Sequence, residues 1–385
     1  MSYFQVVMLL LISVLFITLH SVYADEVNNY SEDCDPSEPG IDPIKHYHAL
    51  YDSAAGKFSY SKHNFESFEA WQEAFRHELK EVLGLNVMER ELADFQIQAE
   101  KISTLEMDDH IREEWLLQVE PTMTIPFYLL RPLGADLSEV RLPLVLTPHG
   151  HNHPELYVGI YNNDAERQSI QDGDRDIAVQ AVREGYLVIS PTVRGFGDTR
   201  NKNDIENNRL HSCRIRLLHG LLVGRTAIGE RVWDISRLID WALENEAVDS
   251  ERIAITGNSG GGTISVFAPA CDTRIRVAMP ASYFCTFVDS IGSIHHCDCN
   301  YVPGMLQLGE MYDVAGLIAP RPFRAINGVE DAIFPIEATR HAYNELRKIY
   351  AVAGAELHCE LYEGDGGHRY YREGAWPFLQ QHFAR

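Results

Sequence analysis

The chain has 385 residues, of which 45% are hydrophobic and 23% charged, a composition typical of a globular protein with a sizeable core. Its formal net charge is −23 at pH 7 and no basic stripe stands out, which argues against nucleic acid as a partner. The length allows one large α/β domain, or one such domain with a small accessory piece.

The N-terminus has the pattern of a targeting segment. An almost purely apolar run from Val6 to Leu19 is followed by small residues and then by Asp25. This run is shorter than the about 20 residues that cross a membrane. It therefore predicts a signal peptide over residues 1–24, cleaved after Ala24, and an exported protein, secreted or periplasmic, without stable membrane insertion. The first five residues lack Lys and Arg, and an uncleaved anchor is the alternative.

The segment before the main sheet divides into three parts. Residues 25–64 are polar and contain three prolines, which predicts an extended N-terminal arm. Hydrophobic residues then recur at three- and four-residue steps, and this predicts an amphipathic helix over residues 65–82. Three β-type runs, at 95–105, 114–119 and 125–130, are expected to begin a sheet with antiparallel strands.

From Leu142 onward, strand patterns alternate with helix patterns. The expected strands are 142–147, 186–193, a run around Ile253, 277–283, 323–327 and 357–362. The expected helices are 176–184, 224–244, 336–353 and 370–383, and residues 195–222 are expected to be a long irregular excursion. This alternation predicts an α/β fold with a mostly parallel, doubly wound sheet flanked by helices. The domain would span residues 65–385, with its catalytic core from about residue 142.

A G-x-S-x-G pattern, Gly-Asn-Ser-Gly-Gly at residues 257–261, lies between an expected strand and an expected helix. In that setting the pattern forms a nucleophile elbow, in which glycines let strand and helix approach closely and the serine stands clear of the strand end. We expect Ser259 to be a nucleophile. The alternative is a glycine-rich turn with an incidental serine.

A serine hydroxyl is a weak nucleophile unless a base takes its proton and an acid orients that base. His368 follows the last expected strand in a glycine-rich loop and is the expected base, with a surface histidine that caps the last helix as the alternative. Asp331 follows the strand at 323–327 and is the expected acid, with Glu330 as the fallback.

The oxyanion of an acyl-transfer intermediate needs two aimed hydrogen-bond donors. One is expected to be the backbone N–H of Gly260, which follows the nucleophile. The other is expected from the loop after the strand at 142–147, where Pro-His-Gly-His occupies residues 148–151, and the backbone N–H of His151 is the candidate.

Two clusters offer metal-ligand types: the histidines within residues 149–153, and His-His-Cys-Asp-Cys at 295–299. Neither has a second local pair to complete four ligands, and a serine mechanism needs no metal. The sequence therefore predicts no metal and no cofactor, with a metal site as the minor alternative at either place. The chain has seven cysteines, an odd number, and we expect one or two disulfide bridges at most.

Three further residues are candidates for a substrate loop: Arg194, His295 and His296. For Arg194, which begins the Arg-Gly-Phe-Gly-Asp run at 194–198, the preferred interpretation is a buried Arg–Asp pair that fixes the loop. A direct substrate contact is the alternative. The segment at 295–299 is expected to be an active-site loop, with a disulfide as one way of holding it.

Taken together, these pieces resemble the α/β-hydrolase superfamily, and within it the secreted acetyl-xylan-esterase-like branch, which is similar to dienelactone hydrolases and cephalosporin deacetylases. The matching pieces are residues 148–151, 194–197, 257–261, Asp331 with 334–335, and 367–368. The resemblance implies a triad of Ser259, Asp331 and His368, and oxyanion donors at Gly260 and His151. Phe196 stands where the deacetylases usually carry Gln, which leaves the substrate open.

The expected function is a secreted serine hydrolase that cleaves carboxylic esters, with acetyl esters of carbohydrates as one candidate class. The expected partner is a small-molecule or carbohydrate ester, and the oligomeric state stays open. A serine peptidase of the prolyl-oligopeptidase type is one alternative, although no propeller-blade repeat precedes residue 142. A non-catalytic binding protein on a hydrolase scaffold is the other.

Overall fold

The computed structural model describes residues 43–54, 56–134 and 140–384. The predicted signal peptide, its cleavage site at Ala24, most of the predicted arm and Cys34 lie outside the described residues. The chain divides into two compact units, Met1–Ser53 and Ala54–Arg385. Among the helices that the structure describes, none combines the length and the apolar character that a membrane crossing requires.

The described part of the first unit contains the helix α2 (Pro43–Asp52), in a segment whose sequence predicts an extended arm. The prediction of an extended arm rested on the prolines of this segment. Proline nevertheless suits the first position of a helix, because its φ is already helical and the N–H that it lacks would have no helical partner. Pro43 stands at that first position.

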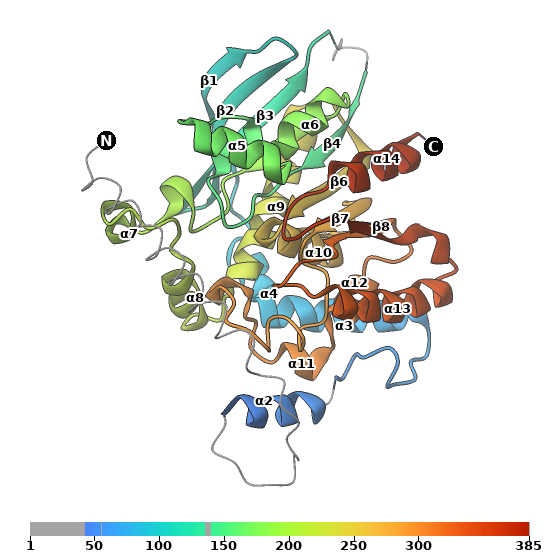
Figure 1. The fold of residues 1–385 in the computed structure, drawn as a ribbon. Helices are drawn as coiled ribbons and strands as arrows, with labels where there is room; N and C mark the ends of the chain where they lie inside the picture. The colour runs from blue at the N-terminus through green and yellow to red at the C-terminus, as the bar shows by residue number, and fades with distance from the viewer. Residues whose placement is uncertain (1–42, 55, 135–139, 385) are drawn as a thin grey trace, which may run out of the picture. The chain divides into compact units, whose positions relative to one another are not determined.

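The second unit is built on one nine-stranded sheet in the order β1-β2-β3-β5-β4-β6-β7-β8-β9 (Figure 1). Pairs from β1 to β3, and β3 with β5, are antiparallel, whereas all pairs from β5 through β9 are parallel. The strands are β1 (Gln98–Glu106), β2 (His110–Glu120), β3 (Met123–Pro132), β4 (Leu142–Leu146), β5 (Leu187–Pro191), β6 (Val248–Asn258), β7 (Val277–Ala281), β8 (Phe323–Gly328) and β9 (Cys359–Gly364). This confirms the predicted α/β fold with its antiparallel extension.

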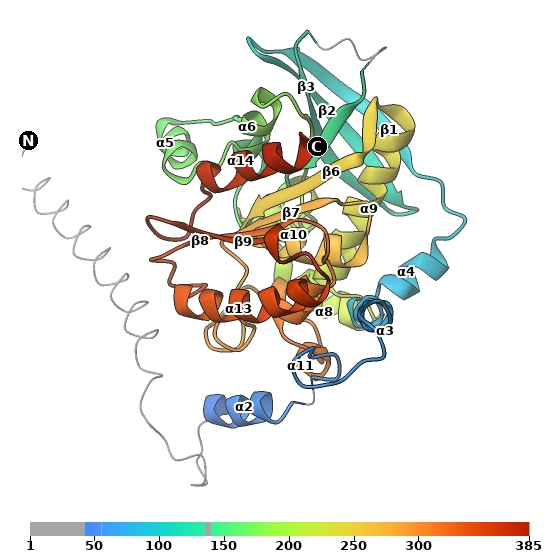
Figure 2. The same ribbon diagram turned by 90° about the vertical axis from the view of Figure 1, so that its right-hand side faces the viewer.

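Helices cover both faces of the sheet (Figures 1 and 2). Neighbouring residues of a strand point to opposite faces, so Leu144 and Leu146 belong to one hydrophobic cluster and Val145 to the other. The first cluster takes in α3 (Phe68–Leu83), α9 (Ala227–Asn245), α10 (Gly260–Cys271), α12 (Met311–Gly316) and α13 (Ile336–Val352). The second takes in α6 (Ile177–Arg183) and α14 (Arg372–Phe383). The remaining α-helices described in this unit are α4 (Leu85–Glu91), α5 (Asp164–Gly173), α7 (Lys202–Glu206), α8 (Cys213–Leu221) and α11 (Met305–Leu308).

The predicted amphipathic helix is α3, and its ends follow from local chemistry. The Ser67 side chain accepts the N–H of Ala70, and Gly84 ends the helix in a left-handed conformation. Trp71 is fully buried, and its Nε1–H donates to the carbonyl oxygen of Phe58 over 2.8 Å. Phe58 is itself buried, so this part of the predicted arm packs on the body of the second unit.

Residues 195–222 differ from the predicted irregular excursion, because they contain α7 and α8. The α8 helix contacts the short 3-10 helix η3 (Asp298–Asn300) and buries Cys213 and Leu217. Packing of α8 against a segment distant in the sequence, with burial of these two side chains, stabilises a helix that its local sequence does not predict.

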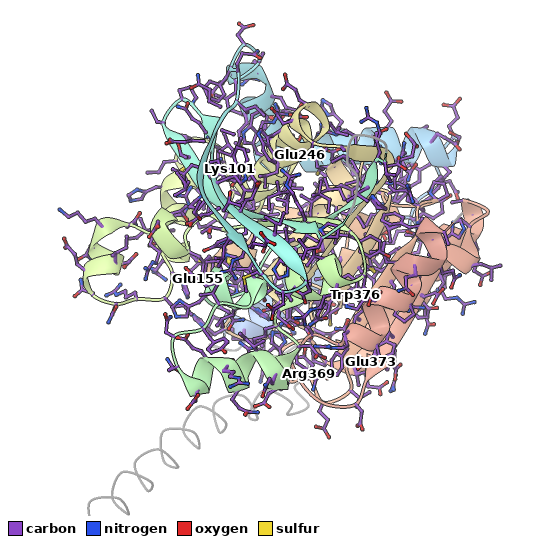
Figure 3. All side chains as sticks on the ribbon, turned by 90° about the horizontal axis from the view of Figure 1, so that it is seen from above. Lys101, Glu155, Glu246, Arg369, Glu373 and Trp376 are labelled. Carbon is purple, nitrogen blue, oxygen red and sulfur yellow. The ribbon has the colours of Figure 1, made fainter. Side chains whose placement is uncertain are left out.

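The antiparallel extension is tied to the body by charged side chains. Glu113 of β2 accepts from Lys101 of β1 over 2.7 Å and pairs with Arg131 of β3, which also pairs with Glu246 at the end of α9. Figure 3 labels Lys101 and Glu246, the first and last residues of this series of ion pairs. On the other side of the sheet, Trp376 of α14 donates to Gln180 of α6 over 3.0 Å (Figure 3).

Candidate active site

Ser259 lies in a strained turn between β6 and α10. Its φ is 58° and its ψ is −117°, a conformation that is costly for a residue with a side chain. A Cβ on Gly257 or on Gly261 would overlap the carbonyl oxygen of Pro148, so both neighbours of the turn must be glycine. The turn leaves Ser259 half-buried at the C-terminal end of β6. This is the local geometry expected of a nucleophile elbow.

The loop after β4 is held against this turn by His149. Its Nε2 accepts the backbone N–H of Val193 over 2.9 Å, so the proton of the neutral ring is on Nδ1, which donates to the carbonyl oxygen of Gly150 over 2.7 Å. Burial lowers the pKa of His149 to about 3. The Gly150 N–H donates in turn to the hydroxyl of Tyr157 over 2.9 Å. The imidazole is thus a neutral brace between the ends of β4 and β5.

The two residues predicted to supply the oxyanion donors, Gly260 and His151, lie next to each other. A Cβ on Gly260 would lie 3.2 Å from the ring of His151, so the loop after β4 touches the first residue of α10. Within the described residues, neither the Gly260 N–H nor the His151 N–H has a hydrogen-bond acceptor in the protein. Both groups are therefore available to a ligand.

The predicted base and acid meet. Nδ1 of His368 and Oδ2 of Asp331 lie 2.8 Å apart. The other oxygen, Oδ1, accepts the backbone N–H groups of Ile333 and Phe334 at 2.9 and 3.1 Å, and the Asp331 side chain has no exposed surface. Glu330, the fallback acid, is exposed. The imidazole of His368 is 25% exposed, so it can reach a solvent-borne substrate.

The loops that carry these two residues are joined through their backbones. The N–H of Glu330 donates to the Gly366 oxygen over 2.8 Å, and the N–H of Val329 donates to the Gly364 oxygen over 3.0 Å. Ser282, at the end of β7, donates its hydroxyl proton to the carbonyl oxygen of Arg369 over 2.8 Å. Because β7, β8 and β9 are neighbours in the sheet, their C-terminal loops form one supported platform.

Phe334 contacts both the base and one of the predicted substrate-loop residues. Its ring stacks on that of His368, with 5.8 Å between centroids, and its centroid lies 5.2 Å from that of His296. His296 is buried, shares a hydrogen bond with the Ser290 hydroxyl at 3.0 Å, and has its pKa lowered to about 4 by burial. His295 is exposed. His296 therefore supports the site from behind.

Arg194 occupies the buried ion pair that was the preferred interpretation, which corrects its place among the substrate-loop candidates. Its side chain is 2% exposed, and Nε and Nη2 donate to the two oxygens of Asp234 over 2.7 and 2.6 Å. Nη1 lies 2.6 Å from a carboxylate oxygen of Glu120. Burial lowers the pKa of Arg194, but these carboxylates outweigh it and hold that pKa above its usual range. Such a guanidinium braces its loop and has no free face for a substrate.

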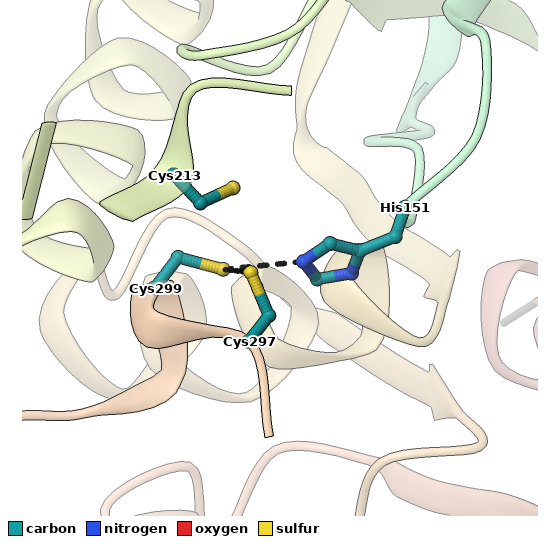
Figure 4. A group of neighbouring side chains, drawn as sticks. All are labelled: His151, Cys213, Cys297 and Cys299. Carbon is teal, nitrogen blue, oxygen red and sulfur yellow. Dashed lines mark hydrogen bonds between the residues drawn. The ribbon is translucent and has the colours of Figure 1, made fainter. Parts of the chain in front are cut away.

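The expected disulfides are not present among the described residues, where all six cysteines are free. Cys271, Cys285 and Cys359 are buried singly. Three others, Cys213, Cys297 and Cys299, gather around the side chain of His151 (Figure 4). The sulfur atoms of Cys297 and Cys299 are 3.5 Å apart, longer than the about 2.05 Å of a disulfide bond.

Comparisons with known proteins find similarity to an esterase family and to a hydrolase. The acetyl xylan esterase family model matches residues 167–301, which include Ser259 but neither Asp331 nor His368. A candidate hydrolase of Bacillus subtilis (strain 168), YtaP, is 27% identical over 298 residues, covering 74% of this chain and 92% of its own.

Solved structures of esterases share the fold. A candidate acetyl xylan esterase from Bacteroides fragilis NCTC 9343 has a TM-score of 0.71 at 15% identity, covering 90% of this chain and 86% of its own. A glucuronoyl esterase of carbohydrate esterase family 15 from Teredinibacter turnerae T7901 has a TM-score of 0.57 at 16% identity, covering 94% of this chain and 98% of its own. The α/β-hydrolase fold and the resemblance to acetyl xylan esterases are confirmed, and the comparisons support a hydrolase of the esterase type.

Proposed function

We propose that this chain, an α/β-hydrolase that resembles acetyl xylan esterases, cleaves carboxylic esters through an acyl intermediate on Ser259. The observation that carries the proposal is the 2.8 Å hydrogen bond between His368 and the buried carboxylate of Asp331. This pair lies in the loops after β8 and β9, at the same edge of the sheet as the strained Ser259. An oriented imidazole at the same edge of the sheet as a half-buried serine is an arrangement suited to nucleophilic catalysis.

In the proposed reaction, the Ser259 hydroxyl oxygen attacks the ester carbonyl while Nε2 of His368 takes the hydroxyl proton. Asp331 keeps the Nδ1–H of His368 in place and stabilises the imidazolium that forms. The tetrahedral intermediate collapses, the bond to the alcohol oxygen breaks, and His368 returns its proton to the leaving alcohol. A water molecule then attacks the acyl-serine by the same steps and releases the acid.

The negative oxygen of each tetrahedral intermediate would be bound by the backbone N–H groups of Gly260 and His151. Their lack of acceptors among the described residues supports this role. The N-terminus of α10 adds the positive end of a helix dipole at the same place. Loss of one such donor typically raises the barrier by about 3 kcal/mol.

For the substrate, we propose an ester of a carbohydrate. The support comes from the acetyl xylan esterase and glucuronoyl esterase named above. We also propose that the chain is exported after cleavage at Ala24, on the strength of the apolar run and the small residues that follow it. N-terminal sequencing of protein recovered outside the cytoplasm tests this, and a sequence that begins at Met1 would contradict it.

The test of the chemistry is Ser259→Ala, assayed on a short nitrophenyl ester and labelled with a fluorophosphonate. We expect no labelling and a loss of kcat of about 10⁴-fold or more. The matched control is Ser265→Ala, because Ser265 is on α10, the helix that follows Ser259, and donates to the carbonyl oxygen of Gly261 over 2.8 Å. Full activity in Ser259→Ala, or equal loss in both variants, contradicts the proposal.

A panel of acetylated sugars, aryl esters and uronate methyl esters tests the substrate class. We expect higher kcat/KM on a sugar ester than on the aryl ester, because remote contacts to the sugar contribute to transition-state binding. Peptide cleavage without ester cleavage would favour the peptidase alternative instead.

A further inference from the structure

Four side chains with metal-ligand chemistry meet beside the candidate active site (Figure 4). They come from three separate segments: His151 from the loop after β4, Cys213 from the first residue of α8, and Cys297 with Cys299 from the turn around η3. The three sulfur atoms and the imidazole nitrogen all lie within 4.8 Å of one another. Cys213 and Cys299 are 0% and 1% exposed.

The spacing of these atoms suits a tetrahedral ion. With zinc–sulfur bonds of about 2.3 Å, the sulfur atoms of a tetrahedral site are about 3.8 Å apart, and a sulfur and a nitrogen are slightly closer. Here the sulfur atoms of Cys297 and Cys299 are 3.5 Å apart. The Cys299 sulfur is 3.3 Å from Nε2 of His151. The side chains thus point at a common centre.

The ring of His151 is held in the orientation that this requires. The buried Phe196 packs edge-on against it, with 5.4 Å between ring centroids and an interplanar angle of 76°. The absence of a side chain at Gly260 makes room for the ring. Phe196 therefore has a structural reason to be aromatic here.

The charge around the cluster supplies an independent argument. Arg231 is 4% exposed, and its Nη2 is 3.5 Å from the Cys213 sulfur. In the described part of the chain, no carboxylate forms an ion pair with Arg231, and its buried Nε has no hydrogen-bond partner. A buried cation without a counter-charge is strongly destabilising. Three thiolates around a divalent ion carry a net charge of −1, which matches the single positive charge of Arg231.

We propose that His151, Cys213, Cys297 and Cys299 bind one Zn²⁺ in a closed, structural site. Three thiolates and an imidazole are the ligand set of structural zinc, whereas a catalytic zinc keeps a position for water. The sequence alone predicts no metal, because neither cluster completes four ligands locally. The fold completes the set from three segments.

The site also has a consequence for catalysis, which rests on the proposed function. The side chain of His151 would be a zinc ligand while its backbone N–H is the proposed oxyanion donor. The ion would therefore fix the oxyanion loop to α8 and to the turn around η3. Loss of the ion is expected to lower kcat more than it raises KM, because the donor acts chiefly in the transition state.

The first test measures metal in the full-length protein as purified. We expect about one zinc per chain in the wild type, and Co²⁺ exchange is expected to give the thiolate charge-transfer and d–d bands of a tetrahedral site. In Cys213→Ala the zinc content and the cobalt spectrum should be lost. The matched control is Cys271→Ala, which removes a buried cysteine outside the cluster and should keep both.

Zinc well below one per chain together with no cobalt spectrum in the wild type overturns the proposal, as does equal loss of metal in Cys271→Ala. A disulfide within the cluster, detected as a peptide mass lighter by two hydrogen atoms, also overturns it. The cobalt spectrum is measured on the wild type, so the proposal remains testable when Cys213→Ala does not fold.

The proposed zinc site and the proposed reaction can be tested independently of each other. Ser259→Ala should keep its zinc, because the serine is not a ligand. Zinc retained in a wild type that cleaves no ester would contradict the reaction and support the site. In an active wild type, we expect folded Cys213→Ala to lose about tenfold or more in kcat; unchanged kcat would overturn the role in fixing the oxyanion loop.

Discussion

Asp331 and His368 are joined by a 2.8 Å hydrogen bond between Oδ2 and Nδ1, although 37 residues separate them in the chain. Both oxygens of Asp331 are in use, one by the imidazole and one by two backbone N–H groups. The backbone bonds between their loops hold the two residues in register. The acid is therefore oriented before any substrate binds.

Replacing Asp331 with Asn keeps the size of the side chain but removes the acceptor that selects the Nδ1–H tautomer of His368. We expect kcat/KM on a nitrophenyl ester to fall roughly 10³- to 10⁴-fold with little change in fold. The matched control is Glu330→Gln, an exposed neighbour, for which we expect less than about a twofold change. The opposite ranking would make Glu330 the acid.

The close contact of the elbow with the loop after β4 predicts a stability effect. Gly261→Ala places a Cβ onto the Pro148 carbonyl oxygen, which is backbone and cannot rotate away. We expect a loss of about 3 kcal/mol or more in the free energy of unfolding, measured by denaturant titration. In Gly367→Ala the nearest atom is 3.6 Å away, and stability should change little. Equal stability of the two variants would argue against this packing.

Arg194 is expected to act on stability and not on substrate binding. Arg194→Ala leaves Asp234 buried without its cation and leaves Glu120 paired with Arg225 alone, and we expect the free energy of unfolding to fall by about 4 kcal/mol. Arg276→Ala removes a surface pair with Glu251 and should cost about 0.5 kcal/mol or less. A folded Arg194→Ala protein with normal stability and a strongly raised KM would instead indicate a substrate contact.

Acid should destabilise the fold through His149 and His296. Burial holds their pKa values at about 3 and about 4, below the ordinary value of 6.5. Between these values the unfolded chain binds more protons than the folded chain, so the free energy of unfolding falls as the pH decreases from about 6.5 towards 4.

A substitution separates the contribution of His296 from other acid effects. His296→Gln should flatten this pH dependence by up to about 3 kcal/mol between pH 7 and pH 4. His295→Gln changes the exposed neighbour and should leave the slope unaltered. Thermal or denaturant unfolding across this range is the measurement, and identical slopes in wild type and His296→Gln would contradict the prediction.

The sequence was sufficient to predict a candidate catalytic residue wherever that residue lies in the loop directly after a recognisable strand. Ser259, Asp331 and His368 each come directly after a recognisable strand, and parallel strands bring their C-terminal loops to one edge. Helices at α2, α4, α5, α7, α8, α11 and α12 were not predicted. The α2 helix begins at a proline, and α8 depends on packing against η3.

The amino-acid sequence by itself thus determined the order of the three candidate catalytic residues along the chain: a serine, then a carboxylate, then an imidazole. Each of them is recognisable from its local sequence. Only the tertiary structure decided which acids surround Arg194 and that His151 reaches the sulfur of Cys299, 148 residues away. The physical reason is that a metal-type cluster or a buried ion pair depends on distances in space. Chain spacing reports those distances only when the partners share one loop or one helix.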